Sequence, residues 1–137
     1  MDDVVLNKVA SIERCLHRVG EEYAGQVEHL ERDITRQDSI ILNIQRACEA
    51  SIDLAMHLVR RFALGVPGES RHAFDLLVDA GKLDAAMADA LKRMVGFRNI
   101  AIHDYQRLNL AIVRSIIEHN LEDLRAFARH ALALSDG

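Results

Sequence analysis

The sequence contains a single Pro and few aromatic residues, namely two Tyr, four Phe and no Trp. Proline breaks helices, and strands favour alternating runs of β-branched and aromatic residues, which are rare in this chain. Half of the residues are apolar, mostly Ala, Leu, Ile and Val, and they lie in long stretches without Gly or Pro. These features predict an all-α fold.

Cysteine is also scarce. The two cysteines, Cys15 and Cys48, lie in apolar stretches at helical spacing. Neither belongs to a CxxC pair or to a Cys/His cluster of the kind that binds zinc. We therefore expect two buried free thiols and no metal site, and no motif in the sequence indicates a bound cofactor.

Long hydrophobic runs are missing as well. No apolar stretch approaches the ~20 residues that a membrane-spanning helix requires, so we expect no membrane association. The start of the chain, Met1–Asp3, is acidic, and it lacks the basic region and the apolar run of a secretory signal. These observations predict a cytoplasmic protein.

An excess of positive charge is the last missing feature. The net charge of -4 at pH 7 argues against a general nucleic-acid coat protein, which needs a broad basic surface. One stretch departs from this balance, because it carries Lys92, Arg93, Arg98 and Arg107 against Asp104 alone. We therefore expect a small, local basic site in an otherwise acidic protein.

The length of 137 residues suits one domain, residues 1–137, with a core that needs no disulfide or metal. Apolar periodicity predicts an antiparallel helical bundle of four main helices and one short helix. The predicted helices cover residues 2–23, 37–64, 70–80, 84–96 or beyond, and 110–134, and residues 26–36 are expected to form a loop or a weak helical turn. The clearest break is Gly65-Val66-Pro67-Gly68, and Asp84 and Asn109 are expected to cap the helices that they precede.

The second predicted helix carries a narrow polar stripe. At ~100° per residue, its polar side chains fall within roughly 80° of arc, opposite the apolar face. We call this set the polar stripe: Arg46, Glu49, Asp53, His57 and Arg60. One interpretation is a solvated face with ordinary salt bridges, including Arg46 with Glu49 and Asp53 with His57. The other is that Glu49 and Asp53 support a polar site, with Asp53 orienting His57 or Glu49 contacting an Arg on another helix.

The chemically richest segment is Gly96–Tyr105, which brings together an Arg, a His and a Tyr. Arg98 could hold a phosphate through its planar fork, His103 could transfer protons near neutral pH, and Tyr105 could offer its hydroxyl. On an uninterrupted helix, Arg98 and Tyr105 would share a face to within ~20°, whereas His103 would lie ~140° from Arg98. The two residues can therefore converge only at a helix end, at a distortion or between two subunits; His103 could equally cap the helix.

The segment resembles the Arg-x4-His-x-Tyr motif of the HEPN superfamily, as found in the HepT toxins that pair with minimal nucleotidyltransferase antitoxins of the MntA type. Arg98, His103 and Tyr105 match all three positions of the motif. Residues 41–55 resemble the second helix of the same family, and the resemblance extends across nearly all of the chain. It implies a toxin that forms a homodimer and cleaves RNA without a metal ion.

Within that resemblance, His103 would act as general base or acid for attack by a ribose 2′-hydroxyl, and Arg98 would stabilise the charge that develops on the phosphorane. Asn99 would help to orient the site. Tyr105 would accept AMP from the nucleotidyltransferase antitoxin, and the added charge and bulk would block the cleft. Two alternatives stay open: a non-catalytic helical partner of a nucleotidyltransferase, and a structural dimer in which Arg98 and His103 pair with carboxylates such as Glu49 and Asp53.

Overall fold

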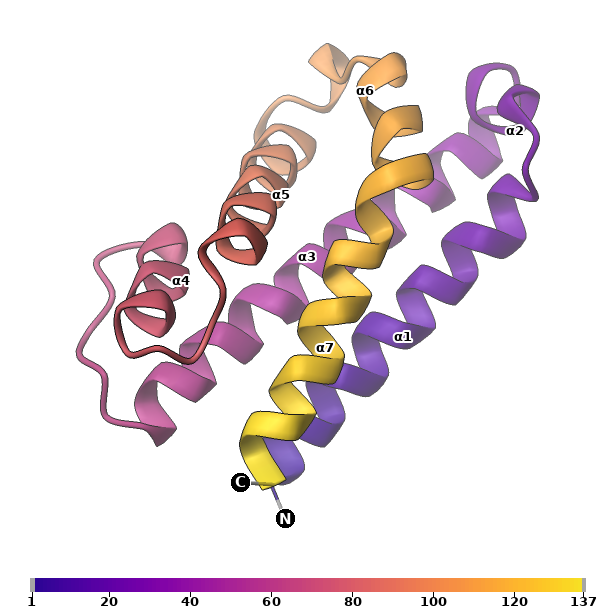
Figure 1. Cartoon of the computed structure of the whole chain (residues 1–137). Helices are drawn as coiled ribbons and strands as arrows, with labels where there is room; N and C mark the ends of the chain where they lie inside the picture. The colour runs from indigo at the N-terminus through magenta and orange to yellow at the C-terminus, as the bar shows by residue number, and fades with distance from the viewer. Residues whose placement is uncertain (1, 137) are drawn as a thin grey trace.

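The structure of the protein is a computed structural model that describes residues 2–136, a range with helices and no β-strand. Most of this range is helical, as Figure 1 shows. The helices are α1 (Asp3–Tyr23), α2 (Val27–Glu31), α3 (Ile34–Arg61), α4 (Ser70–Asp79), α5 (Ala85–His103), the 3-10 turn η1 (Tyr105–Arg107), α6 (Leu110–Ser115), the π-helical turn η2 (Ile116–Asn120) and α7 (Leu121–Asp136). The predicted all-α bundle is confirmed.

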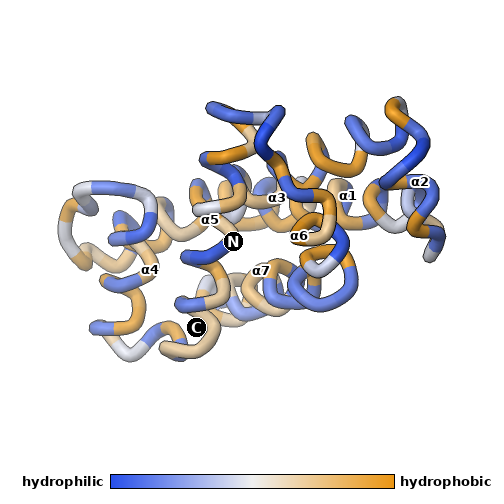
Figure 2. Tube along the Cα trace, turned by 90° about the horizontal axis from the view of Figure 1, so that it is seen from above, coloured by the Kyte–Doolittle hydropathy of each residue, from blue (hydrophilic) through white to orange (hydrophobic). Residues whose placement is uncertain are grey.

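Helix α3 is the central element of the bundle. It packs along α1 on one side and against α4 and α5 on the other, while α7 crosses over α1 and α3 (Figure 1). Along each helix, hydrophobic and hydrophilic residues alternate so that an apolar face can turn toward the neighbouring helices (Figure 2). The start of α1 and the end of α7 lie close together in Figure 1, and Arg61 of α3 contacts both Asp2 and the backbone carbonyl of Ser135.

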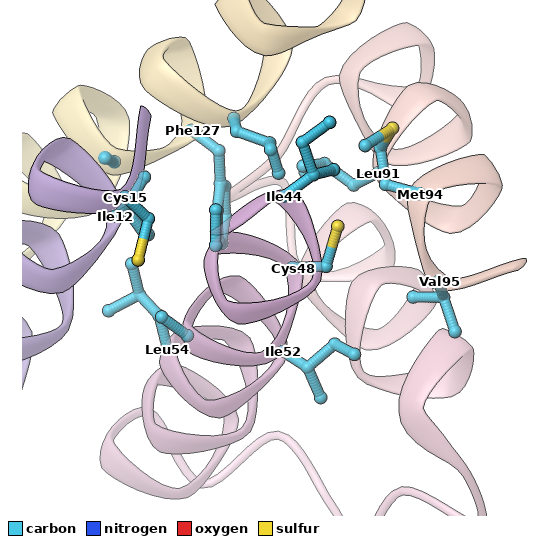
Figure 3. Close-up of a cluster of buried hydrophobic side chains, with 14 of the residues drawn as sticks. Ile12, Cys15, Ile44, Cys48, Ile52, Leu54, Leu91, Met94, Val95 and Phe127 are labelled. Atoms are coloured by element: carbon cyan, nitrogen blue, oxygen red, sulfur yellow. The ribbon is translucent and has the colours of Figure 1, made fainter. Parts of the chain in front are cut away.

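The core is continuous and mostly aliphatic. The aromatic rings of Phe74 on α4 and Phe127 on α7 meet edge to face, with their centroids 5.7 Å apart. Cys15 and Cys48 are buried in this core, as predicted, and Figure 3 shows them among aliphatic side chains from α1, α3 and α5. Burial raises the pKa of the Cys48 thiol to about 12, so this thiol is protonated and inert at neutral pH.

Side-chain caps explain where several helices begin. The carboxylate of Asp2 accepts hydrogen bonds from the backbone N–H groups of Val4 and Val5 at the start of α1. Asp84 caps α5 and Asn109 caps α6, as the sequence predicts, by accepting from Ala86 N and Ala111 N. Such caps satisfy backbone donors that have no partner within the helix.

Two predicted boundaries were wrong in detail. Residues 26–36 contain the short helix α2 and the start of α3 at Ile34, because the carboxylate of Asp33 caps that start by accepting from Arg36 N. At the other end α3 stops at Arg61 and not at Leu64, because Ala63 adopts a left-handed backbone conformation with φ 54°. The helix therefore ends three residues earlier than the Gly and Pro signals indicate.

The final predicted helix, residues 110–134, is interrupted by a π-helical turn. α6, η2 and α7 follow one another as a nearly continuous helix in Figure 1. A π turn inserts one extra residue per turn and shifts every later side chain around the axis. The stripe of apolar residues therefore changes its angle at Ile116–Asn120, which periodicity alone does not reveal.

Candidate active site

Helix α5 carries the motif residues and determines where they point. It is regular from Ala85 to His103 and ends because Asp104 leaves the helical region with φ -153° and ψ 54°. Arg98 therefore lies one and a half turns before the helix end, His103 is in the last turn, and Tyr105 belongs to η1 beyond it. The helix end falls between His103 and Tyr105, not between Arg98 and His103.

The side chain of Arg98 enters the space between α5, α3 and α4. Its guanidinium lies 3.2 Å from a carboxylate oxygen of Glu49 and donates a hydrogen bond of 3.2 Å to the Ser70 hydroxyl. The side chain is 18 % exposed, and its buried Nε atom has no hydrogen-bond partner among the residues that the structure describes. Glu49 and Ser70 thus fix the guanidinium while one donor stays unused.

A small polar pocket of about 150 Å³ opens beside Arg98. It is lined by residues from the start of α4 and from the middle of α5: Glu69, Ser70, Arg71, Val95, Arg98 and Asn99. Arg71 approaches α5 closely, because a side-chain carbon added at Gly96 would lie 3.1 Å from its guanidinium. Two guanidinium groups, a hydroxyl and an amide line this space together with the carboxylate of Glu69, so positive charge outweighs negative charge and the space is suited to an anionic oxygen.

His103 lies on a different side of α5 from Arg98. Because five residues separate them on a regular helix, their side chains point ~140° apart, as the sequence geometry predicts. The imidazole is exposed in the last helical turn, next to the exposed apolar side chains of Ile100 and Ile102. A single chain therefore does not bring Arg98 and His103 together in one pocket.

Tyr105 is held by a residue that the sequence analysis missed. Its hydroxyl donates a hydrogen bond to the carboxylate of Asp38, in the second turn of α3. Partial burial, together with this contact to the negatively charged Asp38, raises the pKa of Tyr105 to about 12. Arg98 and Tyr105 do not share a helix face, because α5 ends before Tyr105 and the uninterrupted helix that such a face would require is absent.

The signal for Asp38 is visible in retrospect. Asp38 precedes Glu49 by 11 residues, which is about three helical turns, so both carboxylates lie on one face of α3 to within ~20°. The polar stripe therefore extends toward the start of α3, where the loop after α5 passes. Ser70 gave no such signal, because its contact with Arg98 depends on how α4 packs against α5.

The polar stripe itself is divided between two neighbours. Glu49 pairs with Arg98, which is the contact with another helix that the sequence analysis considered. Asp53 lies 3.1 Å from the ammonium group of Lys8 on α1, and His57 lies 2.7 Å from the carboxylate of Asp2. The pairings that the spacing permits, Arg46 with Glu49 and Asp53 with His57, are not formed, since Glu49, Asp53 and His57 pair with Arg98, Lys8 and Asp2 instead.

The local excess of positive charge is only partly available. Lys92 pairs with Asp75 at 2.8 Å, and Arg107 lies 3.2 Å from Asp104. Arg93 and Arg107 line the rim of a mostly apolar pocket of about 490 Å³ between α5, the following loop and the π turn. The basic site is thus smaller than a count of charges suggests.

Residues 2–136 contain neither a candidate metal site nor a membrane-spanning helix. No group of three or more His, Cys, Asp or Glu side chains in this range is arranged to hold a metal ion. No helix in the same range is both long and apolar enough to cross a membrane.

Comparison with known proteins shows which family the chain belongs to. Residues 8–131 match the family described as ribonuclease HepT-like. The chain is 48% identical to the mRNA nuclease HepT of Shewanella oneidensis, over 93% of this chain and 95% of that protein. A putative RNase of Archaeoglobus fulgidus is 24% identical over 82% of this chain and 79% of its own length.

Solved structures agree with these sequence matches. The tri-AMPylated HEPN toxin of Shewanella oneidensis in complex with an MNT antitoxin superposes with a TM-score of 0.91 and 47% identity, covering 97% of this chain and 99% of that chain. A toxin–antitoxin structure with AMP-PNP gives a TM-score of 0.91 and 45% identity, covering 96% and 99%. The chain therefore belongs to the HepT-like ribonuclease family. The predicted class, a HEPN ribonuclease toxin, is confirmed.

Proposed function

We propose that this toxin cleaves messenger RNA without a metal ion, and that Arg98 and His103 carry out the reaction. The observation that carries the proposal is the position of Arg98, whose guanidinium is fixed by Glu49 and Ser70 at the wall of a small polar pocket. A fixed guanidinium can stabilise charge that develops on a phosphoryl oxygen without reorganising during the reaction. Asn99 lines the same pocket and orients the phosphate.

In this mechanism His103 removes the proton from a ribose 2′-hydroxyl, which attacks the adjacent phosphorus. The bond from phosphorus to the 5′-oxygen breaks as the protonated imidazole returns the proton to that oxygen, and the products are a cyclic phosphate and a free 5′-hydroxyl. Imidazole suits both proton transfers, because its ordinary pKa lies near neutral pH. The exposed position of His103 at the end of α5 leaves it open to an RNA strand.

We infer that a homodimer completes the site. Arg98 and His103 point ~140° apart on α5, so an RNA phosphate that contacts Arg98 of one copy meets His103 only if a second copy lies alongside. Ile100 and Ile102, which flank the motif, are 46% and 43% exposed. Burial of these two side chains against a second copy would remove apolar surface from water at the same place.

Tyr105 is the proposed point of control. The antitoxin would be a minimal nucleotidyltransferase that transfers AMP to the Tyr105 hydroxyl. The modified side chain would carry a phosphate and an adenosine beside the RNA path, so negative charge and bulk would both oppose RNA binding. The side chain is 40% exposed, which leaves it within reach of a modifying enzyme.

The test is expression of the toxin alone, followed by cleavage of RNA with the purified protein. Wild type should arrest growth and cleave RNA equally well with and without EDTA, while Arg98→Ala and His103→Ala should do neither. Arg129→Ala and His119→Ala, which change exposed residues elsewhere on the C-terminal helical segment, serve as matched controls. Growth arrest that survives both motif substitutions would refute the assignment, and inhibition by EDTA would refute the metal-independent mechanism.

The partner is tested separately. The reading frame beside this one should encode a small nucleotidyltransferase, and its co-expression should increase the mass of the toxin by whole AMP units. Tyr105→Phe should abolish that increase. A toxin that binds the nucleotidyltransferase but neither cleaves RNA nor accepts AMP would support the non-catalytic alternative.

A further inference from the structure

The contact between Asp38 and Tyr105 joins two distant parts of the chain. Asp38 lies on α3, whose start is fixed by the Asp33 cap, and Tyr105 lies in η1, whose backbone is closed by a hydrogen bond of 3.1 Å from Leu108 N to Tyr105 O. Both partners are therefore held by regular backbone. The phenol hydroxyl and the carboxylate are in hydrogen-bond contact while the backbone of α3 and of η1 stays regular.

A tyrosine hydroxyl needs help to accept a phosphoryl group. With a pKa of about 12, Tyr105 is almost entirely a neutral phenol near pH 7. A neutral phenol is a weak nucleophile, and it must lose its proton as it attacks phosphorus. General base catalysis by a carboxylate already hydrogen-bonded to the hydroxyl meets this requirement.

We propose that Asp38 is the general base that activates Tyr105 for AMP transfer. The proposal rests on the proposed role of Tyr105 as the AMP acceptor. The Tyr105 oxygen attacks the α-phosphorus of ATP, supplied by the nucleotidyltransferase, and forms a new phosphodiester bond. The bond between the α-phosphorus and the bridging oxygen breaks, pyrophosphate leaves, and the phenol proton passes to the carboxylate of Asp38.

The surroundings of Asp38 favour the approach of a nucleotide. Asp38 also lines an open groove of about 620 Å³ between α1 and α3. The charged and titratable groups that line it are mostly positive or neutral: Arg14, Cys15, His17, Arg18, Glu21 and Arg46. Their net positive charge offsets the repulsion that Asp38 alone would exert on a triphosphate. In this groove the carboxylate can accept a proton while the phosphate groups lie near guanidinium groups.

The experiment measures the initial rate of AMP incorporation with the cognate nucleotidyltransferase, ATP and Mg²⁺. Asp38→Asn keeps the shape of the side chain and a hydrogen-bond partner for the phenol but cannot accept the proton, so kcat should fall by about 100-fold or more with little change in the KM for ATP. Asp38→Glu restores the carboxylate and should recover part of the rate. Asp79→Asn removes an exposed carboxylate at the end of α4 and should react like wild type.

A pH profile separates base catalysis from simple positioning. The residual rate of Asp38→Asn should rise with pH, because ionised phenol replaces the missing base, while the wild-type rate should change little across neutral pH. An Asp38→Asn rate within a few-fold of wild type, or an equal loss in Asp38→Glu, would overturn the inference. Failure of the wild-type toxin to accept AMP at all would instead overturn the proposed switch on Tyr105, and the role of Asp38 with it.

Discussion

The polar face of α3 divides between Glu49 and Asp53, and the N-terminal and C-terminal parts contain similar residues but contact different parts of the molecule. At the N-terminal end, Asp38 and Glu49 reach Tyr105 and Arg98, two of the three motif residues. At the C-terminal end, Asp53 pairs with Lys8, and His57 and Arg61 meet the carboxylate of Asp2. One end thus holds the candidate active site, and the other ties Asp2 and, through Arg61, the backbone carbonyl of Ser135 to the bundle.

The difference shows that the role of a carboxylate on a polar helix face depends on the residue that it contacts on the neighbouring helix. Glu49 and Asp53 are one turn apart, and each forms one ion pair with a cation from a neighbouring helix. Glu49 fixes a guanidinium that is largely buried, whereas the Lys8–Asp53 pair is half exposed. Glu49 supports the candidate active site because it faces α5, whereas Asp53 forms a surface ion pair because it faces α1.

The largest expected effect is that of the Glu49→Ala substitution on the rate of RNA cleavage. Without the carboxylate, the Arg98 guanidinium loses its fixed position beside the pocket, and cleavage should fall by about 10- to 100-fold, as for other supporting residues. Asp53→Ala, the matched substitution one turn away, should lose less activity. Rates of RNA cleavage at equal protein concentration test this order. An equal loss in both variants would contradict the different roles of Glu49 and Asp53.

The next effect is on the ionisation of Tyr105. Its raised pKa of about 12 comes first from burial and then from Asp38. In Asp38→Asn the pKa should therefore fall but stay above the ordinary value of 10.0, because the burial remains. Tyrosinate absorbance during an alkaline titration measures it, with Tyr105→Phe as the reference that leaves only Tyr23. An unchanged pKa in Asp38→Asn would contradict the contact.

The C-terminal end of the face should control stability at acidic pH. The hydrogen bond from His57 holds the pKa of Asp2 at about 2, below its ordinary value of 3.8. A lowered pKa stabilises the folded chain above pH 3.8, and this contribution disappears as the pH falls toward 2. Asp2→Asn should therefore lower Tm near neutral pH by a few degrees and match wild type near pH 2.

A comparison of Asp2→Ala with Asp2→Asn separates two contributions of Asp2 to stability, namely its negative charge and its hydrogen bonds to the start of α1. Asparagine can still accept hydrogen bonds from Val4 N and Val5 N, whereas alanine cannot. Asp2→Ala should therefore be less stable than Asp2→Asn at every pH, by a constant amount. Thermal melts recorded from acidic to neutral pH distinguish the two effects, and a wild-type advantage over Asp2→Asn that does not vary with pH would argue against the ion pair.

The smallest effect is expected for the Lys8–Asp53 pair. Its side chains are 36% and 52% exposed, and such surface pairs contribute about 0 to 1 kcal/mol. Asp53→Asn should change the free energy of unfolding by less than ~1 kcal/mol, and high salt should reduce the difference further. Urea denaturation measures it. A larger loss would mean that Asp53 does more than join α1 to α3.

Local patterns predicted much of this molecule. The caps Asp84 and Asn109, the buried Cys15 and Cys48, and the angle between Arg98 and His103 all follow from short-range geometry and hydrophobic spacing. The polar stripe was located correctly, and a contact of Glu49 with an Arg on another helix was among the alternatives, but the partners of Asp53 and His57 were not predicted. An ion pair between helices depends on which side chains the packing brings opposite each other, and periodicity along one helix contains no such information.

The sequence by itself determined the helices, the apolar core and the Arg-x4-His-x-Tyr motif, because each depends on residues that are neighbours along the chain. Only the tertiary structure decided that Arg98 enters a pocket between Glu49 and Ser70, that Tyr105 meets Asp38, and that His103 faces outward. The physical reason is the end of α5 at His103 and its packing against α3 and α4, which send three residues of one short motif in three directions.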